Sequence, residues 1–550
     1  MEIFDSDHAA QIDNLVGPGT SRDLAMGTLE SAQRFTDDLG LWSPPIQSAD
    51  ATILPGKGTN DARVRQMAEN DGFVQSGVNV QKDNIVGSDF FPVMKPELAV
   101  LGSGADEQWA DEFKEEFESK FYLIAESPNN WLDASRKNTL TGLVRMAVGL
   151  DCVGGEVLAT AEWLRDAGRP VHTAIQMVDC DRLSTPYELQ GTDKRIRGGI
   201  EMDRYGAAQA YHIRMAHPSD FDRALDQFQW KRIPARKPWG RQQVIYLNDA
   251  TRPDQTRGVS DIVAGLKALK ITNRFRDVTL QNAVANAMFA ASIESELPPE
   301  AAYAQIGTQG PGKAVTDFAA QYLGAIAAYA KSSKHLQLDG VKIPHLFPGT
   351  KLQLRPAGAG GGVGVEFEQS LLRHLAAILG ISYEQLSKDY SKTNYSSARA
   401  GMVEARKAMT VRKRRVADRF ASHILRLTFE EMVNNNMLET MKYSRLPNIY
   451  DPLMMDAYTQ CDWIGAAMGQ VDELKETQAA ALRLKYNLST LEDEIAKQGK
   501  DWRKVLIQRE KEVKELEARG LVMELDDNMM NAASGEPREK TGEQENASTE

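Results

Sequence analysis

The chain has 550 residues, enough for several domains and a large core, and its 26% content of charged residues is ordinary for a soluble protein. No run of about 18 apolar residues occurs, and the first residues, MEIFDSDHAAQ, lack the basic-then-apolar pattern of an export signal, so we expect neither a membrane span nor secretion. The net charge of −12 disfavours a protein that grips nucleic acid over a broad positive surface.

The cysteines and histidines predict no metal site. Cys152, Cys180 and Cys461 form no CxxC pair, which argues against a zinc ribbon or a disulfide framework, and we expect them to be small buried residues. The eight histidines show no HExxH spacing, and His212 and His217 fall in a strand-like stretch where a structural role is expected. No nucleophile, base and acid stand at motif spacing, so we predict no catalytic residue, metal or cofactor.

The first half of the chain mixes helices with short strands. Residues 1–40 read as a mobile arm, and residues 105–122 as a helix. The alternating positions Val171, Thr173, Ile175 and Met177 share one face of a predicted strand, and residues 198–215 read as a hairpin that turns at 203–206. These patterns predict an α/β domain over about 41–256.

A long helix is expected over residues 258–296, because apolar residues recur there at helical spacing with almost no breakers. Its second half is rich in alanine, which allows close helix approach. Residues 298–356 then form a compact insert, with a helix at 314–330 and a short strand pair around 335–354. A glycine-rich linker at 358–364 leads to the next helix.

Residues 363–400 are expected to form a helix, a tight turn, a short helix and a polar loop. Gly380 is the predicted C-cap of the first helix, Ser382 and Gln385 make a capping box for the second, and the loop spans 388–397. One apolar stripe lies on the first helix, made by Phe367, Leu371, Leu372, Leu375, Ile378 and Leu379.

This segment also fits a DNA-reading helix-turn-helix over residues 366–390, because Ala376, Gly380 and Leu386 have the spacing that closes such a turn. Against this alternative, Glu384 on the second helix would repel phosphate and only Lys388 would help binding.

Basic residues dominate the next helical stretch, where nine cations face two acids between Arg399 and Arg426. Such a run of cations usually forms a solvated helix face without a specific partner. The more specific interpretation is a surface that faces DNA or an acidic neighbour. We call six of its members the basic belt: Arg406, Lys407, Arg412, Lys413, Arg414 and Arg415. After residue 461 the chain is helical and heavily charged, and from 525 it is expected to be disordered.

Two glycine-rich segments resemble nucleotide-binding loops but lack necessary parts. Gly307, Gly312 and Lys313 fit GxxxxGK, yet Ala314 stands where a hydroxyl should bind Mg²⁺, and the preceding residues read as helix rather than strand. The tract GAGGGVG satisfies GxGxxG in no register. A P-loop ATPase is therefore a weaker alternative than the helix-turn-helix protein.

The segment FEQSLLRHLAAILGISYEQLSKDYSKTNYSSARA resembles the lambda-type family of tailed-phage portal proteins. The resemblance runs in family order from about residue 41 to 500, through LWSPPIQSADATILP, ARVRQMAENDGFVQSGVNVQKDNIVGS, RGGIEMDRYGAAQAYHI, DQTRGVSDIVAGLKALK, NAMFAASIESEL, CDWIGAAMGQVDELKETQAA and LEDEIAKQGK. It implies an α+β multidomain portal fold, with a mixed α/β wing, long stem helices, a small α/β clip and a helical crown.

The domain boundaries implied by this resemblance follow the elements above. They are a mobile arm at 1–40, the wing at 41–257, the first stem helix at 258–296, the clip at 297–356, the linker and second stem helix at 357–386, the channel loop at 387–397, wing and crown helices at 398–460, the helical crown at 461–524 and a disordered tail at 525–550.

For function, the resemblance implies a ring of 12 copies at one capsid vertex, which seeds procapsid assembly and is the channel for genome packaging and ejection. The expected partners are the terminase large subunit, the major capsid and scaffold proteins, the head-tail connector and non-specifically held double-stranded DNA, with no membrane. The protein would reside in the virion, and in the host cytoplasm during assembly. The expected channel-loop contacts to DNA are Lys388, Tyr390, Lys392, Asn394 and Tyr395.

Overall fold

The computed structural model describes residues 44–193, 195–289, 336–338, 341–343, 363–391, 394–442, 445–467, 469 and 473–521. The chain divides into two compact units, one formed by Met1–Val263 with Leu379–Glu550 and the other by Ala264–Ile378. Among the described helices, none is both long and apolar enough to span a lipid bilayer. The expected arm, the helix at 314–330, the GxxxxGK segment and the C-terminal tail lie outside the described residues.

The first unit begins with six described α-helices, four of which start at a side-chain cap. Asp71 accepts from the backbone N–H groups of Phe73 and Val74, at 2.9 and 3.1 Å, and so stabilises the start of α4. Asp106 and Thr139 cap α6 and α7 in the same way. The helices of this part are α2 (Ala49–Ile53), α3 (Lys57–Asn70), α4 (Gly72–Ile85), α5 (Leu98–Leu101), α6 (Glu107–Ala125) and α7 (Leu140–Gly154).

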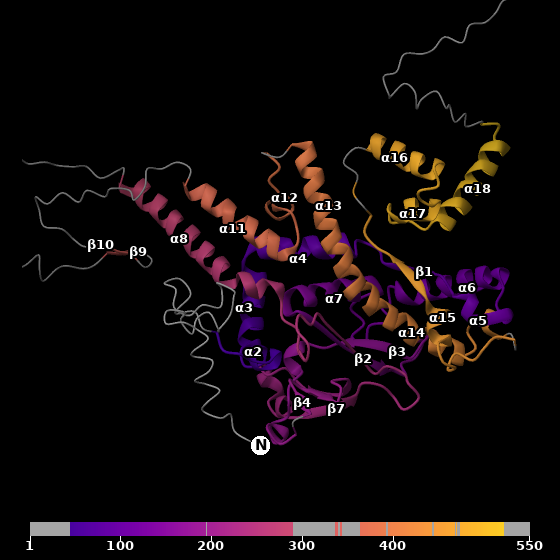
Figure 1. The fold of residues 1–550 in the computed structure, drawn as a ribbon, viewed down its shortest axis with the longest axis horizontal. Helices are drawn as coiled ribbons and strands as arrows, with labels where there is room; N and C mark the ends of the chain where they lie inside the picture. The colour runs from indigo at the N-terminus through magenta and orange to yellow at the C-terminus, as the bar shows by residue number, and fades with distance from the viewer. Residues whose placement is uncertain are drawn as a thin grey trace, which may run out of the picture. The chain divides into compact units, whose positions relative to one another are not determined.

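Three antiparallel sheets follow in the same unit (Figure 1). The first has the order β3-β2-β8, from β2 (Glu156–Trp163), β3 (Thr173–Met177) and β8 (Val244–Asn248). The second has the order β4-β5-β6-β7, from β4 (Ile196–Arg197), β5 (Ile200–Met202), β6 (Ala208–Arg214) and β7 (Trp230–Pro234). The third pairs β1 (Phe91–Met94) with β11 (Cys461–Ile464).

The predicted hairpin is confirmed between β5 and β6. Asp203 accepts from the N–H groups of Tyr205 and Ala207, both at 2.8 Å, and Gly206 supplies the positive φ of +86° that the turn requires. His212 is buried in β6, whereas His217 lies beyond the end of that strand. A core of buried side chains from both larger sheets joins them, including Leu158, Cys180, Ile200, Tyr211, Ile233 and Val244.

Helix α6 carries an aromatic stripe that forms a second core. Trp109, Phe113, Phe117 and Phe121 recur every four residues, and neighbouring rings stack with centroids 5.1, 5.8 and 5.6 Å apart. Phe429 of α14 (Arg419–Asn434) meets two of these rings edge-on. The helix predicted at 105–122 is therefore present, displaced by two or three residues at its ends.

The C-terminal half of the first unit is helical. Helix α13 (Tyr395–Arg412), a π-helical segment (Lys413–Asp418) and α14 (Arg419–Asn434) form one continuous run. Helix α14 packs on β3 and β8 and beside α7 (Figure 1). The remaining helices of this unit are α12 (Tyr383–Ser387), α15 (Met454–Thr459), α16 (Glu473–Lys485), α17 (Leu491–Ala496) and α18 (Trp502–Ala518).

The second unit contains two long helices, α8 (Leu266–Phe289) and α11 (Val363–Leu379), which pack against each other. Phe275 and Phe367 meet edge to face at 5.4 Å, and Arg276 forms an ion pair with Glu368 at 2.6 Å. A short antiparallel hairpin, β9 (Leu336–Leu338) with β10 (Val341–Ile343), lies within the predicted strand pair. Helix α8 starts later than the sequence indicated, because Asp261–Gly265 forms a 3-10 turn.

Candidate nucleic-acid interface

The turn after α11 has the geometry that the sequence predicted. Gly380 has a φ of +65° and ends α11. The hydroxyl of Ser382 accepts from the N–H of Gln385 at 3.2 Å, and the Gln385 side chain accepts from the N–H of Ser382 at 3.1 Å. The capping box is therefore confirmed.

Helix α4 holds this turn in place. A side chain on Gly77 would collide with Leu379, because a Cβ there would lie 2.4 Å from its Cδ1 atom. Gln81 donates from Nε2 to the Leu379 carbonyl at 2.6 Å. Because α12 has only five residues and Leu386 on it is buried, it is too short to be the recognition helix of a helix-turn-helix.

The expected channel loop is shorter than predicted. Lys388 caps α12 with a left-handed φ of +57°, and Tyr390 is 54% exposed. Asp389 accepts from the N–H and hydroxyl of Ser391 at 3.0 and 2.6 Å, which folds this stretch into a local turn. Asn394 caps α13 by accepting from the N–H of Ser397 at 2.8 Å. Its side-chain oxygen is thus already used, Tyr395 lies in the first turn of α13, and Lys392 lies outside the described residues.

The basic belt divides into two halves with different surroundings. On α13, Lys407 is 69% exposed and pairs with Glu404 at 2.7 Å, while Arg406 donates to the carbonyl of Gly469 at 2.6 Å. Arg414, in the π-helical segment, is exposed. Lys407 and Arg414 are exposed, as a surface for DNA or a neighbouring subunit requires, whereas Arg406 is half-buried.

The other half of the belt forms ion pairs inside the subunit. Asp151 of α7 pairs with Arg412 at 3.3 Å and with Arg415 at 2.8 Å, although its own side chain is only 3% exposed. Arg412 also pairs with Asp261, and Arg415 with Asp249. In the same half, Lys413 pairs with Asp418 at 2.7 Å and donates to the carbonyl of Trp463 at 2.8 Å. These three cations therefore join the helical run from α13 to α14 to α7, to the segment after β8 and to β11.

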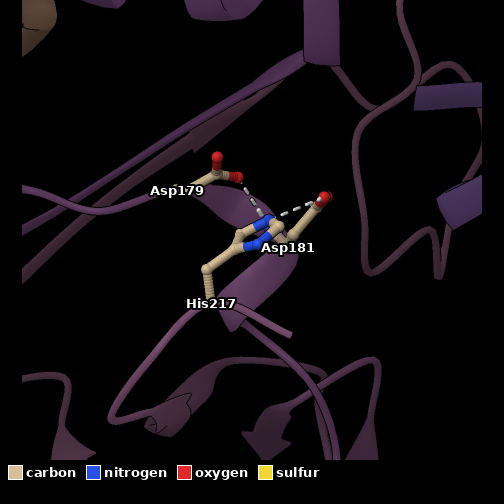
Figure 2. Close-up of side chains that lie close together, drawn as sticks. All are labelled: Asp179, Asp181 and His217. Carbon is tan, nitrogen blue, oxygen red and sulfur yellow. Dashed lines mark hydrogen bonds and ion pairs between the residues drawn. The ribbon is translucent and has the colours of Figure 1, made fainter. Parts of the chain in front are cut away.

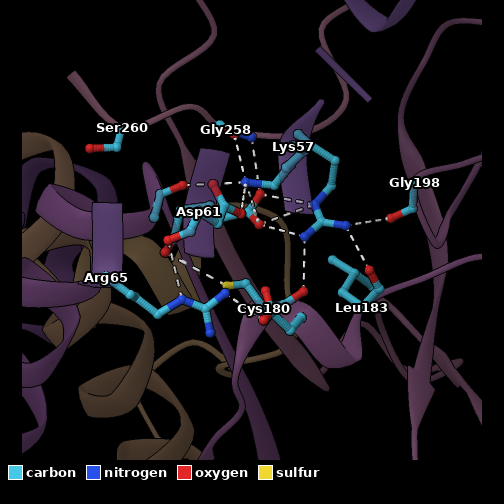
Figure 3. Close-up of polar contacts among 12 residues, drawn as sticks. Lys57, Asp61, Arg65, Cys180, Leu183, Gly198, Gly258 and Ser260 are labelled. Atoms are coloured by element: carbon cyan, nitrogen blue, oxygen red, sulfur yellow. Dashed lines mark hydrogen bonds and ion pairs between the residues drawn. The ribbon is translucent and has the colours of Figure 1, made fainter. Parts of the chain in front are cut away.

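A second buried ion network lies where the chain leaves the first unit (Figure 3). Arg257 forms a bidentate pair with Glu156 of β2, with Nε 3.1 and 3.0 Å from the two carboxylate oxygens. Lys57 pairs with the same carboxylate at 3.2 Å, and the Tyr246 hydroxyl donates to it at 2.7 Å. Burial acts to raise the pKa of Glu156, but the charge and hydrogen bonds of Arg257, with the charge of Lys57, lower it to about 2.

Backbone contacts fix the same junction. Arg257 also donates to three carbonyl groups, those of Cys180, Leu183 and Gly198, at 2.9, 2.7 and 2.9 Å. Gly258 touches Gly155 so closely that a Cβ would lie 2.0 Å from the Gly155 carbonyl oxygen. No pattern in the sequence predicted this network, although Arg257 and Gly258 belong to the segment DQTRGVSDIVAGLKALK that resembles the portal family. An Arg-Gly pair just before a long helix was the available signal.

Asp179, Asp181 and His217 place their possible ligand atoms within 4.8 Å of one another, as a metal site would (Figure 2). The guanidinium of Arg65, however, pairs with Asp181 and lies 3.8 Å from Asp179. Because a cation already balances these carboxylates, the arrangement is an ion-pair cluster that joins α3 to the loops beside the second sheet. Cys152 and Cys180 are buried and Cys461 is half-buried, close to the expectation for all three.

Comparison with known proteins assigns the chain to a family. Residues 36–413 match the family model described as phage portal protein, lambda family. Portal protein B of Escherichia phage lambda is 33% identical over 516 residues, which cover 93% of this chain and 94% of that protein. The portal protein of Escherichia phage N15 is 32% identical over 513 residues, with 93% and 94% covered.

A more distant relative and a solved structure are also similar. The probable portal protein of Halomonas phage phiHAP-1 is 22% identical over 456 residues, covering 82% of this chain and 79% of that protein. A chain from the neck of an empty GTA particle covers 80% of this chain and 96% of its own length, with 12% identity and a TM-score of 0.37. The family match and the lambda and N15 relatives show that the chain belongs to the lambda family of phage portal proteins.

Proposed function

We propose that the protein forms a closed ring of 12 copies at one vertex of a phage head, seeds procapsid assembly and is the channel through which the genome enters and leaves. The observation that carries the proposal is the family match over residues 36–413, together with portal relatives that align over 93% of the chain. Heterologous contacts that close produce such rings. The expected places are the virion and, during assembly, the host cytoplasm.

In this proposal the insert at 298–355 is the clip, which docks the terminase large subunit and later the head-tail connector. The two helices that flank the insert, α8 and α11, are held together by the ion pair between Arg276 and Glu368 and by the contact between Phe275 and Phe367. Two helices packed in this way are suited to carry the insert as a projecting element. The terminase supplies ATP hydrolysis, and the portal chain itself is not an enzyme.

The channel loop is proposed to be the short stretch between α12 and α13, with Lys388, Tyr390 and Lys392 as its DNA contacts. Tyr390 is exposed there, and the helices on both sides end in caps, so the loop has fixed ends. A channel must release DNA as it moves, and the net charge of −12 favours the weak, non-specific contact that this requires.

One size measurement tests the proposal against its alternatives. Twelve copies of 60.9 kDa give about 0.73 MDa, whereas a helix-turn-helix protein or a P-loop ATPase would be a small oligomer. Native mass spectrometry and negative-stain imaging of the purified protein should show closed rings near that mass. A monodisperse monomer or dimer at high concentration would overturn the proposal, as would magnesium-dependent ATP turnover that is lost in Lys313→Ala.

A further inference from the structure

A cleft of about 240 Å³ lies between α13 and the pair α16 and α17, all in the first unit. Its walls are partly apolar, with Met402 and Val403 on α13 facing Ala479 and Ala480 on α16. Six charged side chains also line it: Arg399, Arg406, Arg483, Lys497, Glu476 and Glu494. With four cations and two carboxylates the lining carries a net charge of +2, within a chain whose net charge is −12.

The carboxylate of Glu494 is fully used within the crown helices. Arg483 donates to its two oxygens at 2.9 and 2.7 Å, and Lys497 donates to it at 2.8 Å. The hydrogen bond from Arg483 is the main reason that the pKa of Glu494 lies far below its usual range, so this group stays ionised. Two cations share one carboxylate there, which leaves one positive charge in excess.

The two α13 cations that line the cleft, Arg399 and Arg406, have no acidic partner among the described residues. Arg399 is exposed and makes no hydrogen bond or ion pair among the described residues, and Arg406 donates only to the neutral carbonyl of Gly469. The two arginines are seven residues apart, which places them two turns apart on the same face of the helix. Guanidinium groups aimed at one space recruit an anion whose oxygens can accept their paired N–H donors.

We propose that this cleft binds phosphate groups, and that in the assembled particle these come from the backbone of double-stranded DNA; the second part rests on the proposed portal function. Arg399 and Arg406 would bind the phosphate oxygens, while Met402 and Val403 would contact the sugar. A space of this size also admits bridging water. The site is distinct from the channel loop, because it is built by α13 together with α16 and α17 and contains none of the residues 387–394.

The test compares two double variants that each remove two positive charges. Arg399→Gln with Arg406→Gln empties the cleft of its α13 cations. Lys514→Gln with Arg519→Gln is the matched control, because these cations lie on α18 and at its C-cap, are 70% and 67% exposed, and do not line the cleft. Both proteins must elute at the size of the unmodified protein and give its circular dichroism spectrum before binding is measured.

Binding of a short fluorescent duplex is measured by anisotropy across a range of salt concentrations. We expect the cleft variant to lose about tenfold in affinity and to reduce the slope of log K against log salt by about 2, because each phosphate contact contributes about 0.9 to that slope. The control should keep the slope of the unmodified protein. If the cleft variant and the control have equal affinity and slope, the cleft does not bind DNA phosphate and the proposal is overturned.

Inorganic phosphate distinguishes the two sources of the ligand. If phosphate alone raises the melting temperature of the unmodified protein and the control but not of the cleft variant, free phosphate suffices for recognition. If only the duplex shows the difference, the site needs the DNA backbone. This binding measurement does not depend on ring assembly. If the protein forms no ring but the cleft variant still binds DNA more weakly than the control, only the proposed portal function is contradicted. If the protein forms a normal ring but the two variants bind DNA equally, only the proposed phosphate site is contradicted.

Discussion

Glu156 and Arg257 lie 101 residues apart in the sequence and form an ion pair in which the Glu156 side chain has no exposed surface. Glu156 begins β2, and Arg257 belongs to the last residues of the first unit before the chain continues into α8. The pair therefore fixes the last residues before α8 to the sheet of β2, β3 and β8. Since Lys57 and Asp61 join the same cluster, α3 is held at this point as well.

The first prediction follows from the burial of this pair. Glu156→Gln keeps the shape of the side chain but leaves Arg257 and Lys57 buried without their carboxylate, so we expect the free energy of unfolding to fall by about 3–5 kcal/mol. The control is Asp226→Asn, which breaks the exposed pair with Arg223 at 2.8 Å and should change stability little. Urea denaturation followed by fluorescence measures both. Equal midpoints for the two variants would show that the network is not stabilising.

The second prediction concerns the inner half of the basic belt. Changing Arg412, Lys413 and Arg415 together to Gln leaves Asp151 buried without a counter-charge, so we expect a lower urea midpoint. The salt dependence of DNA binding should stay as in the unmodified protein, because these side chains are engaged by Asp151, Asp249, Asp261 and Asp418. A flatter salt dependence at unchanged stability would instead place these cations on DNA.

Local features were predictable from the sequence because their causes lie within a few residues. The capping box of Ser382 and Gln385, the turn at Asp203 and the helix that carries the aromatic stripe each depend on neighbours in the chain. The start of α8 was not predictable in this way. Its position depends on the 3-10 turn at Asp261–Gly265, next to the segment that Arg257 and Gly258 pin to β2.

The candidate interface was predictable only in part, for a related reason. The run of cations from Arg406 to Arg415 is visible in the sequence, but Asp151 and Asp249, which neutralise its inner half, are 166 to 264 residues from Arg415. The cleft likewise needs α16 and α17, about 80 residues after the start of α13, to meet the arginines of that helix. A charge pattern shows which cations exist, and only the fold shows which of them have acidic partners.

The third prediction is a pH dependence caused by Glu118 of α6. This carboxyl accepts from the N–H of Met94 at 2.7 Å, and burial raises its pKa from 4.5 to about 7. The folded protein therefore keeps a proton that the unfolded chain loses, so its contribution makes stability fall as pH rises from about 4.5 to about 7 and level off above that. The shift corresponds to roughly 3 kcal/mol.

Glu118→Gln tests this directly, because the amide removes the titration and can still accept the hydrogen bond from Met94. We expect the variant to be more stable than the unmodified protein at pH 8 and to lose its advantage near pH 4.5. Denaturation midpoints measured at half-unit pH intervals give the difference curve. A difference that does not vary with pH would mean that Glu118 is ionised in the folded protein across this range.

The fourth prediction concerns the insert between the two packed helices. Replacing residues 298–355 by a short flexible linker should leave ring formation at least partly intact, because the contacts of Phe275 with Phe367 and of Arg276 with Glu368 are kept. Capture of the terminase should be lost. A pull-down with purified terminase, with the intact ring as control, measures this, and undiminished capture by the truncated ring would rule out the insert as the docking element.

The last prediction concerns the channel loop, whose described ends are fixed by Lys388 at the close of α12 and by Asn394 at the start of α13. Removing residues 389–392 keeps both caps, so the flanking helices and the ring should form, and terminase docking should be unaffected. The deletion takes away Tyr390 and Lys392, two of the proposed DNA contacts, and should reduce several-fold the fraction of heads that retain a full genome.

The substitution Tyr390→Phe, which keeps the aromatic side chain and removes only its hydroxyl group, is the milder comparison. The yield of filled heads is counted by electron microscopy and the packaged DNA is sized on gels. If particles built with the deletion variant package and hold full-length genomes as well as particles built with the unmodified protein, the loop has no part in handling DNA.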